Sequence, residues 1–253
     1  MKIYNRVIPV LLLMGNGVYK TKNFENPQYI GDPINAVKIF NEKEVDELII
    51  IDILATVENK KISYDLIKDI ASEAFMPICY GGGIKSIEQI SKLLKIGIEK
   101  VSINNEALDN IDFIKSAVND FGSSTIVGSI DIRKNLFGKN LVYRNSGKKN
   151  TGLNPVEFAK YLEKNGVGEL LITSINQEGT LSGYDISIIK KITEQVKIPV
   201  IANGGAGSLE DMRKALIEAN ASAVAAGSMF VYYGKHSAVL INYPDRLSIE
   251  NLV

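Results

Sequence analysis

The chain has little of several residue types, and each shortage excludes a class of protein. Its 253 residues include one cysteine, Cys79, which cannot form an internal disulfide, so a reducing compartment such as the cytoplasm is expected. His236 is the only histidine, which leaves almost no material for a Ser-His-Asp triad or a multi-histidine metal site. We therefore predict no metal and no cofactor.

Neither charge nor hydropathy points to nucleic acid or a membrane as a partner. The chain has 29 basic and 29 acidic residues, so its formal net charge is zero and it lacks the basic excess that either surface attracts. The longest apolar run, residues 7–14, is far shorter than the roughly 20 residues that span a bilayer. Because that run contains Pro9 and no cleavage site follows it, no signal peptide is predicted.

The chain repeats itself at half its length. Residues 50–83 run from an apolar strand through Tyr64 and Asp65, a helix and a proline-led strand to a glycine turn. Residues 171–205 repeat that order, with Tyr184 at the matching place. Such a repeat has to be identified before any fold is assigned, because it sets the architecture.

Extending the register of the repeat backwards exposes a difference between its two copies. Residues 7–14 then align with residues 126–133, and Leu12 lies opposite Asp131. One copy thus keeps an acid where the other has an alkyl side chain.

Continuous apolar runs alternate with amphipathic segments along the whole chain. The predicted strands are residues 7–13, 48–52, 78–80, 100–103, 125–130, 169–173, 200–202 and 223–226. Strands that are apolar throughout indicate a sheet covered on both faces. Eight of them, with helices between and a half-length repeat, predict an α/β fold: a single (β/α)8 barrel domain made of two half-barrels, about residues 1–122 and 123–253. A doubly wound open sheet is the alternative.

Two long connections occupy equivalent places in the two halves. Residues 15–32 are predicted to form a polar loop, and residues 134–154 an insert with a hairpin. Both follow the carboxyl end of a strand, where the active sites of such barrels lie. Long loops on that face often serve as lids.

Small and amide residues follow several predicted strands on the same face. Glycine lets backbone amides approach an anion closely, so the repeat predicts two phosphate cradles and a ligand phosphorylated at both ends. The alternative is that these glycines only form tight strand-to-helix turns. The residues predicted to bind phosphate or substrate are Gly82, Gly83, Asn104, Asn105, Gly179, Gly204, Gly205, Gly227 and Ser228.

Asp131 is the predicted catalytic residue, because a carboxylate at the mouth of the barrel suits general acid or base catalysis. A helix cap or a salt-bridge partner is the alternative role. Lys20 and Lys22 could close over a phosphate or simply remain solvated, and Asp52 could support a loop or hold a ligand hydroxyl. The predicted supporting residues are Lys20, Asp52, Ser146, Thr173 and Glu178.

The opposite face of the predicted barrel carries a second charged cluster. Two cations and two carboxylates each stand at the start of a predicted strand: Arg6, Glu47, Lys100 and Glu169. From the residues alone, a salt-bridged plug that stabilises the barrel is the simplest interpretation.

Over almost its whole length the sequence resembles the cyclase subunit of imidazole glycerol phosphate synthase. The matching stretches include Arg6-Val7-Ile8-Pro9, Gly81-Gly82-Gly83-Ile84, Ser129-Ile130-Asp131 and Ser146-Gly147-Lys148-Lys149-Asn150-Thr151-Gly152. The resemblance implies a (β/α)8 barrel that takes ammonia from a glutaminase subunit at its amino-end face. It also implies passage of the ammonia through the barrel to a substrate with two phosphates. Arg6, Glu47, Lys100 and Glu169 match the charged gate at the family's ammonia entrance.

The chain departs from that family at the other face. The family uses two aspartates as acid and base; Asp131 matches the second, but Leu12 stands at the place of the first. The family's Asp-x-Asp-Gly-Thr motif appears here as residues 176–180, Asn-Gln-Glu-Gly-Thr. Residues 236–244 lack a helical period where an eighth amphipathic helix is expected.

These departures resemble a subgroup of paralogues found with surface-sugar pathways, the acetamidino modification proteins. That resemblance implies delivery of ammonia to a separate sugar amidotransferase, which converts an N-acetyl group into an acetamidino group. Two alternatives remain open: a working cyclase in histidine biosynthesis, and a non-catalytic barrel that only scaffolds its partners.

Overall fold

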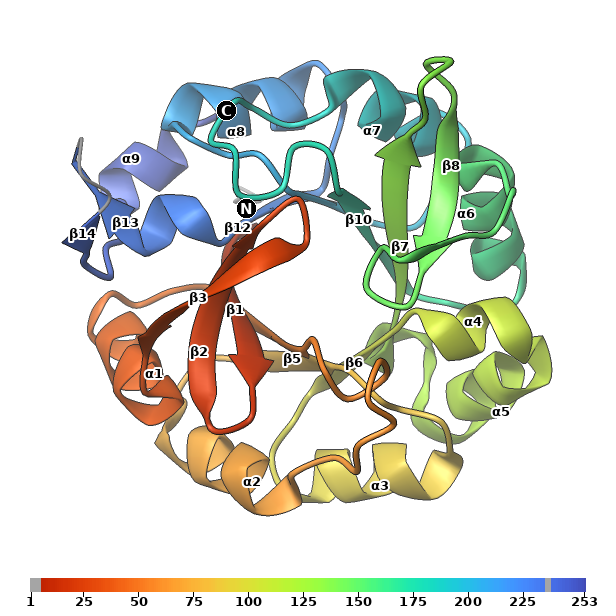
Figure 1. The fold of residues 1–253 in the computed structure, drawn as a ribbon, viewed down its shortest axis with the longest axis horizontal. Helices are drawn as coiled ribbons and strands as arrows, with labels where there is room; N and C mark the ends of the chain where they lie inside the picture. The colour runs from red at the N-terminus through yellow and green to blue at the C-terminus, as the bar shows by residue number, and fades with distance from the viewer. Residues whose placement is uncertain (1–5, 235–237) are drawn as a thin grey trace.

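A closed barrel of parallel strands forms the centre of the computed structural model, which describes residues 6–234 and 238–253 (Figure 1). Around the barrel the strands follow chain order: β1 (Arg6–Met14), β4 (Leu48–Asp52), β5 (Ile78–Gly81), β6 (Lys100–Ile103), β7 (Ile126–Lys134), β10 (Glu169–Ser174), β11 (Val200–Asn203) and β12 (Ala223–Ala226). Because β12 pairs with β1 and β7 pairs with β10, no edge remains. The predicted (β/α)8 barrel is confirmed, and the open doubly wound sheet is wrong.

Helices surround the barrel and cover its outer face (Figure 1). They are α1 (Pro33–Glu42), α2 (Tyr64–Glu73), α3 (Ile87–Lys95), α4 (Asn105–Asp109), α5 (Ile111–Phe121), α6 (Pro155–Lys164), α7 (Ile186–Thr193) and α8 (Leu209–Ile217), with short 3-10 turns η1 (Ser123–Thr125) and η2 (Ser228–Phe230). Local chemistry sets the helix starts. The Asp32 side chain accepts from the amide of Asn35, and Ser86 and Gln89 complete a capping box before α3.

The connection after β1 is a β-hairpin, so the prediction of a polar loop over residues 15–32 is wrong. Strand β2 (Gly17–Lys22) pairs antiparallel with β1 through a two-residue turn that begins at Gly15, and β3 (Glu25–Gly31) pairs with β2. The polar sequence of β2 concealed the strand, because its Lys20 and Thr21 are buried against the barrel mouth. The hairpin predicted after β7 is confirmed by β8 (Asn140–Arg144) and β9 (Lys149–Asn150).

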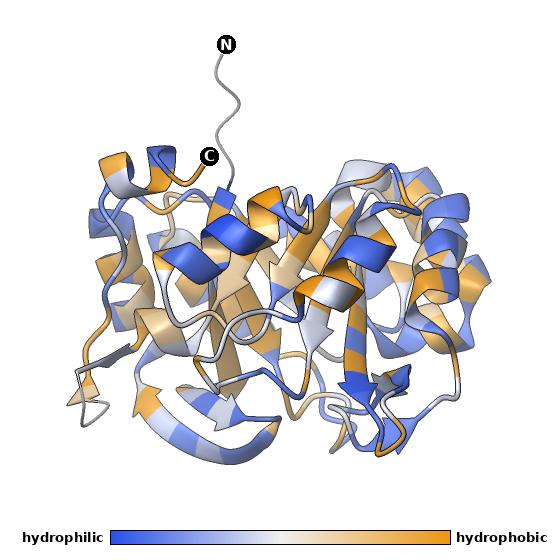
Figure 2. Ribbon diagram, turned by 90° about the horizontal axis from the view of Figure 1, so that it is seen from above, coloured by the Kyte–Doolittle hydropathy of each residue, from blue (hydrophilic) through white to orange (hydrophobic). Residues whose placement is uncertain are grey.

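Apolar side chains form two clusters, one between the strands and the helices and one inside the barrel. In the ribbon coloured by hydropathy, much of the barrel strands is hydrophobic (Figure 2). The interior cluster is made of Ile8, Val10, Ile49, Cys79, Val127, Leu171, Ile201, Ala223 and Ala225. Cys79 is 1% exposed, and burial raises the pKa of its thiol, which fits the expected inert core cysteine.

After β12 the described chain has no long helix, in line with the broken pattern of the sequence. It forms β13 (Tyr232–Tyr233), β14 (Ala238–Val239) and the single helical turn α9 (Arg246–Glu250), while His236 and Ser237 lie outside the described residues. The Tyr243 hydroxyl donates to the carbonyl of Val7 at 2.8 Å, which fixes this segment to the start of β1. None of the described helices is long and apolar enough to span a membrane.

Candidate functional site

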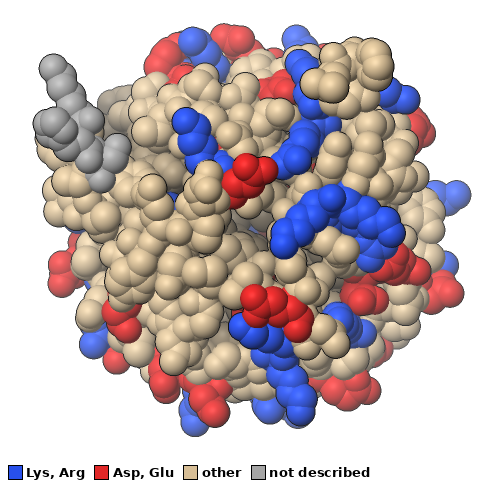
Figure 3. Space-filling view, viewed as in Figure 1, with Lys and Arg blue, Asp and Glu red and all other residues tan. Residues whose placement is uncertain are grey.

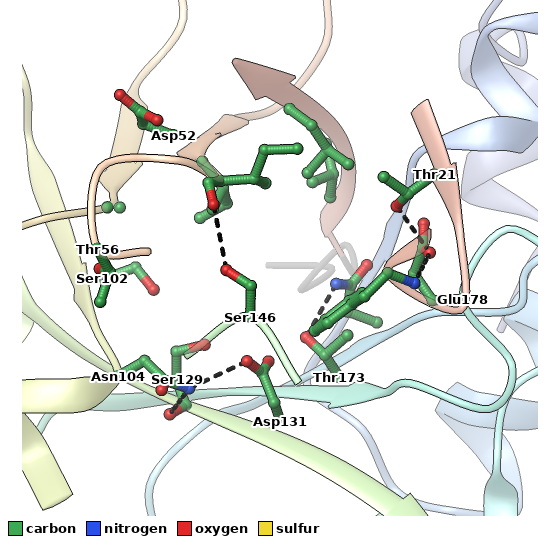
Figure 4. Close-up of a pocket in the computed structure, with 18 of the residues that line it drawn as sticks. Thr21, Asp52, Thr56, Ser102, Asn104, Ser129, Asp131, Ser146, Thr173 and Glu178 are labelled. Carbon is green, nitrogen blue, oxygen red and sulfur yellow. Dashed lines mark hydrogen bonds between the residues drawn. The ribbon is translucent and has the colours of Figure 1, made fainter. Parts of the chain in front are cut away.

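The carboxyl ends of the barrel strands surround a cavity of about 510 Å³ (Figure 4). In the space-filling view, basic and acidic side chains both lie around the hollow at the centre of this face (Figure 3). The cavity brings together every residue that the sequence predicted for this face: Lys20, Asp52, Gly82, Gly83, Asn104, Asn105, Asp131, Ser146, Thr173, Glu178, Gly179, Gly204, Gly205, Gly227 and Ser228.

Asp131 projects from β7 into the cavity, although β7 continues past it to Lys134 and does not end there as predicted. Its carboxylate accepts a hydrogen bond from the side-chain amide of Asn104 at 3.2 Å (Figure 4). Among the described residues no cation pairs with it, so a salt-bridge role is excluded within that part of the chain. Burial raises its pKa to about 7. Both protonation states are therefore populated near neutral pH, as proton transfer requires.

Leu12 takes the equivalent position in the first half of the barrel. Leu12 lies between the hairpin strand β2 and the barrel strand β4, as Asp131 lies between β8 and β10. Its side chain lines the cavity and packs on the apolar cluster inside the barrel. An alkyl group thus occupies the place where a second acid would face Asp131.

Two other carboxylates of the cavity are committed to holding loops. Oδ1 of Asp52 accepts from the backbone amides of Leu54 and Ala55, each at 3.0 Å, so Asp52 supports the loop after β4. Oε2 of Glu178 accepts from the Thr21 hydroxyl at 3.0 Å (Figure 4). Burial raises the pKa of both carboxyl groups. Neither has the free, cavity-facing geometry of Asp131.

The glycine turns are required by close packing in both halves. Gly82 has a φ of +117°, and a Cβ there would lie 2.5 Å from the Asp52 carbonyl oxygen. Gly204 has a φ of +89°, and its Cβ would lie 2.8 Å from the carbonyl of Ser174. In each half the carboxyl end of the preceding strand therefore packs directly on the turn. The turn-forming role is a property of this structure, and phosphate binding by the same turns stays a prediction.

Lys20 is buried, so the alternative that it is a solvated loop lysine is wrong. It is 2% exposed, and its ammonium group donates to the Val10 carbonyl and lies 2.5 Å from the point that a Cβ on Gly227 would occupy. Burial lowers its pKa to about 8, and the charge of Glu178 acts in the opposite direction. Lys20 forms no ion pair with any described residue. Lys22, two positions along β2, is exposed.

Loops from both halves meet over the cavity. A Cβ on Gly179 would lie 2.2 Å from the carbonyl oxygen of Thr21, so the loop after β10 fits closely against the β2–β3 hairpin. The Ser146 hydroxyl donates to the carbonyl of Ile53 at 3.1 Å and joins the β8–β9 connection to the loop after β4 (Figure 4). These contacts hold loops of the two halves together at the rim of the barrel mouth.

Sequence reasoning missed a polar group at the first-half side of the cavity. Asn145 and Asn105 exchange two hydrogen bonds, at 3.1 Å and 2.5 Å. Arg144 forms a bidentate ion pair with Asp109, with one contact of 2.5 Å. The only signal was that residues 144 and 145 fall in the insert predicted on this face. Their contacts depend on the pairing of β7 with β8.

At the amino ends of the strands, the four predicted residues form a closed ring of ion pairs. Arg6 contacts Glu47 at 2.5 Å and also contacts Glu169, while Lys100 lies 3.1 Å from Glu47 and 3.0 Å from Glu169. Both carboxylates are buried. Burial disfavours the charged forms of Arg6 and Lys100, but the attraction of the two carboxylates is stronger than this effect. The pKa values of Arg6 and of Lys100 therefore both lie above their usual values. The clustering is as expected, and a gating role stays a prediction.

The fold and the site define a (β/α)8 barrel with a polar cavity at one face and a neutral ring of ion pairs at the other. Residues 6–237 match the family described as histidine biosynthesis protein, and the chain belongs to that family.

Named relatives support that assignment over almost the full chain. The chain is 49% identical to the "Putative imidazole glycerol phosphate synthase subunit hisF2" of Pseudomonas aeruginosa, over 96% of this chain and 97% of that protein. It is 45% identical to a protein of the same description, named HisF, from Leptospira borgpetersenii, over 98% of each. It is 39% identical to the imidazole glycerol phosphate synthase subunit HisF of Alkaliphilus metalliredigens, over 91% of each.

Proposed function

We propose that this chain is the barrel subunit of a glutamine-dependent complex. It receives ammonia from a glutaminase subunit at its amino-end face and delivers it through the barrel for acetamidino-sugar synthesis by a sugar amidotransferase. One observation carries the proposal: the ring of ion pairs at the amino-end face is complete, while the cavity position equivalent to Asp131 in the first half holds Leu12.

The amino-end ring suits the entrance of a conduit. Glu47 and Glu169 are nearly fully buried, whereas the Arg6 and Lys100 side chains are 28% and 22% exposed, so the cations face the surface where a partner would dock. Each cation bridges both carboxylates, and movement of one side chain leaves the second cation to hold the carboxylates. Opening of the ring would leave two buried carboxylates with one cation, so a docked partner would have to compensate the remaining charge.

The interior beyond the ring suits neutral ammonia. It is lined by aliphatic side chains such as Ile49 and Val127, and Leu12 and Ile51 pack against them below the cavity. Transfer of an ammonium ion into such surroundings is strongly unfavourable, whereas the neutral molecule has a small polar surface to desolvate. The barrel would thus pass ammonia and exclude both ammonium and bulk ions.

The cavity is poorly equipped for ring closure. Cyclisation needs an acid and a base, and loss of one member of such a pair commonly costs on the order of 10²–10⁴-fold in rate. Asp131 stands on a barrel strand with the Asn104 amide as its described hydrogen-bond partner, while the cavity carboxylate of Glu106 lies on α4. Asp131 can therefore move the proton that accompanies ammonia transfer, but Leu12 supplies no second group.

A working cyclase in histidine biosynthesis is the second candidate. It is favoured by the name of the relatives, imidazole glycerol phosphate synthase subunit, and by the buried lysine beside Gly227. It requires another group to act in place of the missing acid, and Asp52 and Glu178 are both engaged in loop contacts.

Isotope transfer tests the proposal. The chain would be combined with its glutaminase subunit and a sugar amidotransferase, and supplied with amide-15N glutamine, an N-acetylated sugar nucleotide and unlabelled ammonium. We expect 15N in the acetamidino product, with little dilution by the ammonium, because the nitrogen travels inside the barrel. Equal labelling when the barrel subunit is omitted would contradict the proposal.

A further inference from the structure

The two halves of the cavity have the same backbone at matching positions but different side chains. Asn104, at the end of β6, has φ −110° and ψ −75°, and Gly227, at the end of β12, has φ −106° and ψ −74°. The repeat therefore builds one backbone frame twice. Any difference in what the two ends bind must come from the side chains that enter each frame.

A buried cation enters the second-half frame. The ammonium of Lys20 occupies the space beside Gly227, and one described acceptor, the carbonyl of Val10, serves its three donors. A buried ammonium that forms no ion pair is unfavourable, and the more distant charge of Glu178 does not offset the burial that lowers the pKa of Lys20. An anion at this end would satisfy the remaining donors and replace the lost solvation. The side chain is thus placed to bind one phosphate group.

At the first-half frame, positive charge is already compensated without a ligand. Its cation, Arg144, is held by both carboxylate oxygens of Asp109. Asn105 and Asn145 are bonded to each other, and Glu106 adds a negative charge at the start of α4. A phosphate placed here would meet two carboxylates and a guanidinium whose charge is already paired with Asp109, with only its Nε left without a described partner. The amide groups keep unused donor and acceptor capacity, which suits hydroxyl or amide groups of a ligand.

The exposed lysines at the rim of the cavity add little to the binding of an anion at the first-half end. Lys85 is exposed and donates to the side chain of Asn59 at 2.7 Å, and Lys148 is exposed. A solvated lysine contributes little to anion binding compared with a buried one, because water screens its charge.

We infer that the cavity takes a ligand with a single phosphate at the second-half end and an uncharged hydroxyl- or amide-bearing portion at the first-half end. The inference rests on the proposed function, since it names the ligand class of that cavity. It replaces the doubly phosphorylated ligand that the symmetry of the sequence predicts. The asymmetry is set by Lys20 on one side and by the Arg144–Asp109 pair on the other.

Phosphate stoichiometry tests the inference. Equilibrium dialysis with labelled inorganic phosphate should find one ion per chain. Lys20→Met keeps the buried aliphatic stem but removes the charge, so it should fold and bind phosphate at least about tenfold more weakly. Lys22→Met, on the exposed side of the same strand, is the matched control and should bind as the parent does. Two ions per chain, no binding at millimolar phosphate, or full binding by Lys20→Met would each overturn the inference.

A converse variant tests the first-half end. Asp109→Asn frees the Arg144 guanidinium from its carboxylate, so this variant should gain a second phosphate site. A count that stays at one would overturn the claim that Asp109 excludes phosphate. Ribulose 5-phosphate and ribulose 1,5-bisphosphate should bind the parent chain within about threefold of each other, and a bisphosphate at least about tenfold tighter would overturn the single-phosphate assignment. Isotope transfer from glutamine is measured without these ligands, so it reports on the proposed function separately.

Discussion

Leu12 and Asp131 occupy equivalent positions in the two halves of the barrel, and only one of them can transfer a proton. Leu12 pairs with Tyr19 of the following hairpin, as Asp131 pairs with Tyr143. Both side chains line the same cavity. The backbone that would present a second acid is thus intact, and a single side chain changes what the cavity can do.

Replacement of Asp131 should affect activity and stability in opposite directions. In the reconstituted complex, Asp131→Asn should lower glutamine-dependent product formation by about 10²-fold or more, because the other cavity carboxylates of the described chain hold loops or lie on α4. The same variant should be more stable than the parent at pH 8, by roughly 1–4 kcal/mol, because the parent must bury an ionised carboxylate. Full activity in Asp131→Asn would remove the catalytic role.

The pH dependence of that stability has a defined sign. The pKa of Asp131 is raised to about 7 in the folded chain, above the value of about 3.9 expected when unfolded. Its contribution is therefore complete at pH values below about 4 and is lost as the pH rises through about 7. Thermal unfolding of the parent and of Asp131→Asn should converge near pH 4 and separate by pH 8. Asp112→Asn, at an exposed position, should show no such separation.

Lys100→Met should open the amino-end ring. It leaves Glu47 and Glu169 with Arg6 alone, so we expect a loss of roughly 1–4 kcal/mol in the free energy of unfolding. Incorporation of glutamine nitrogen should fall relative to incorporation of added ammonium. The matched control is Lys115→Met, which breaks an exposed pair with Asp112 and should cost less than about 1 kcal/mol. Unchanged coupling in Lys100→Met would show that the ring is only a structural plug.

Burial of Lys20 should also make the free energy of unfolding depend on pH in the alkaline range. Its pKa is lowered to about 8 by burial, against about 10.4 in an unfolded chain. Between these values the unfolded state binds more protons, so the parent should gain up to roughly 3 kcal/mol as pH rises from 8 to 10.5. Chemical denaturation at both pH values should detect this gain and its absence in Lys20→Met. An equal gain in Lys20→Met would place the effect on another group.

Gly179→Ala should loosen the hairpin that covers the cavity. Gly179 has a φ of +72°, and its Cβ would lie 2.2 Å from the carbonyl of Thr21. Gly138, at the tip of the β7–β8 hairpin, has a φ of +77° with nothing within 4 Å, so Gly138→Ala carries the same backbone strain without the collision. We expect Gly179→Ala to cost roughly 1–3 kcal/mol more than Gly138→Ala.

Limited trypsin digestion would measure the same effect locally. Cleavage after Lys22 should accelerate in Gly179→Ala, because the loop after β10 can no longer rest on the β2–β3 turn. Equal digestion rates in the two alanine variants would show that the loop contact does not hold the hairpin.

Much of the fold could be predicted from the sequence because apolar runs and a repeat determine a closed barrel. The register that aligned Leu12 with Asp131 agrees with the strand pairing. The β2–β3 hairpin was not predicted, because Lys20 and Thr21 look like loop residues and are buried only by tertiary contacts.

The candidate site was predicted in position but not in its internal contacts. Residues at strand ends must meet in a barrel, and they do so around one cavity. The pairing of Arg144 with Asp109 and of Asn145 with Asn105 depends on how a hairpin folds over its neighbour. No local pattern encodes such contacts, which join residues about 35 to 40 positions apart.

A cyclase assay tests the central claim most directly. The purified chain would be mixed with ammonium and phosphoribulosyl-formimino aminoimidazole-carboxamide ribonucleotide, and consumption of that substrate would be followed optically. We predict no turnover above background, because Leu12 stands where the second acid would be. Robust turnover would contradict the account and identify the chain as a working cyclase in which Leu12 is tolerated.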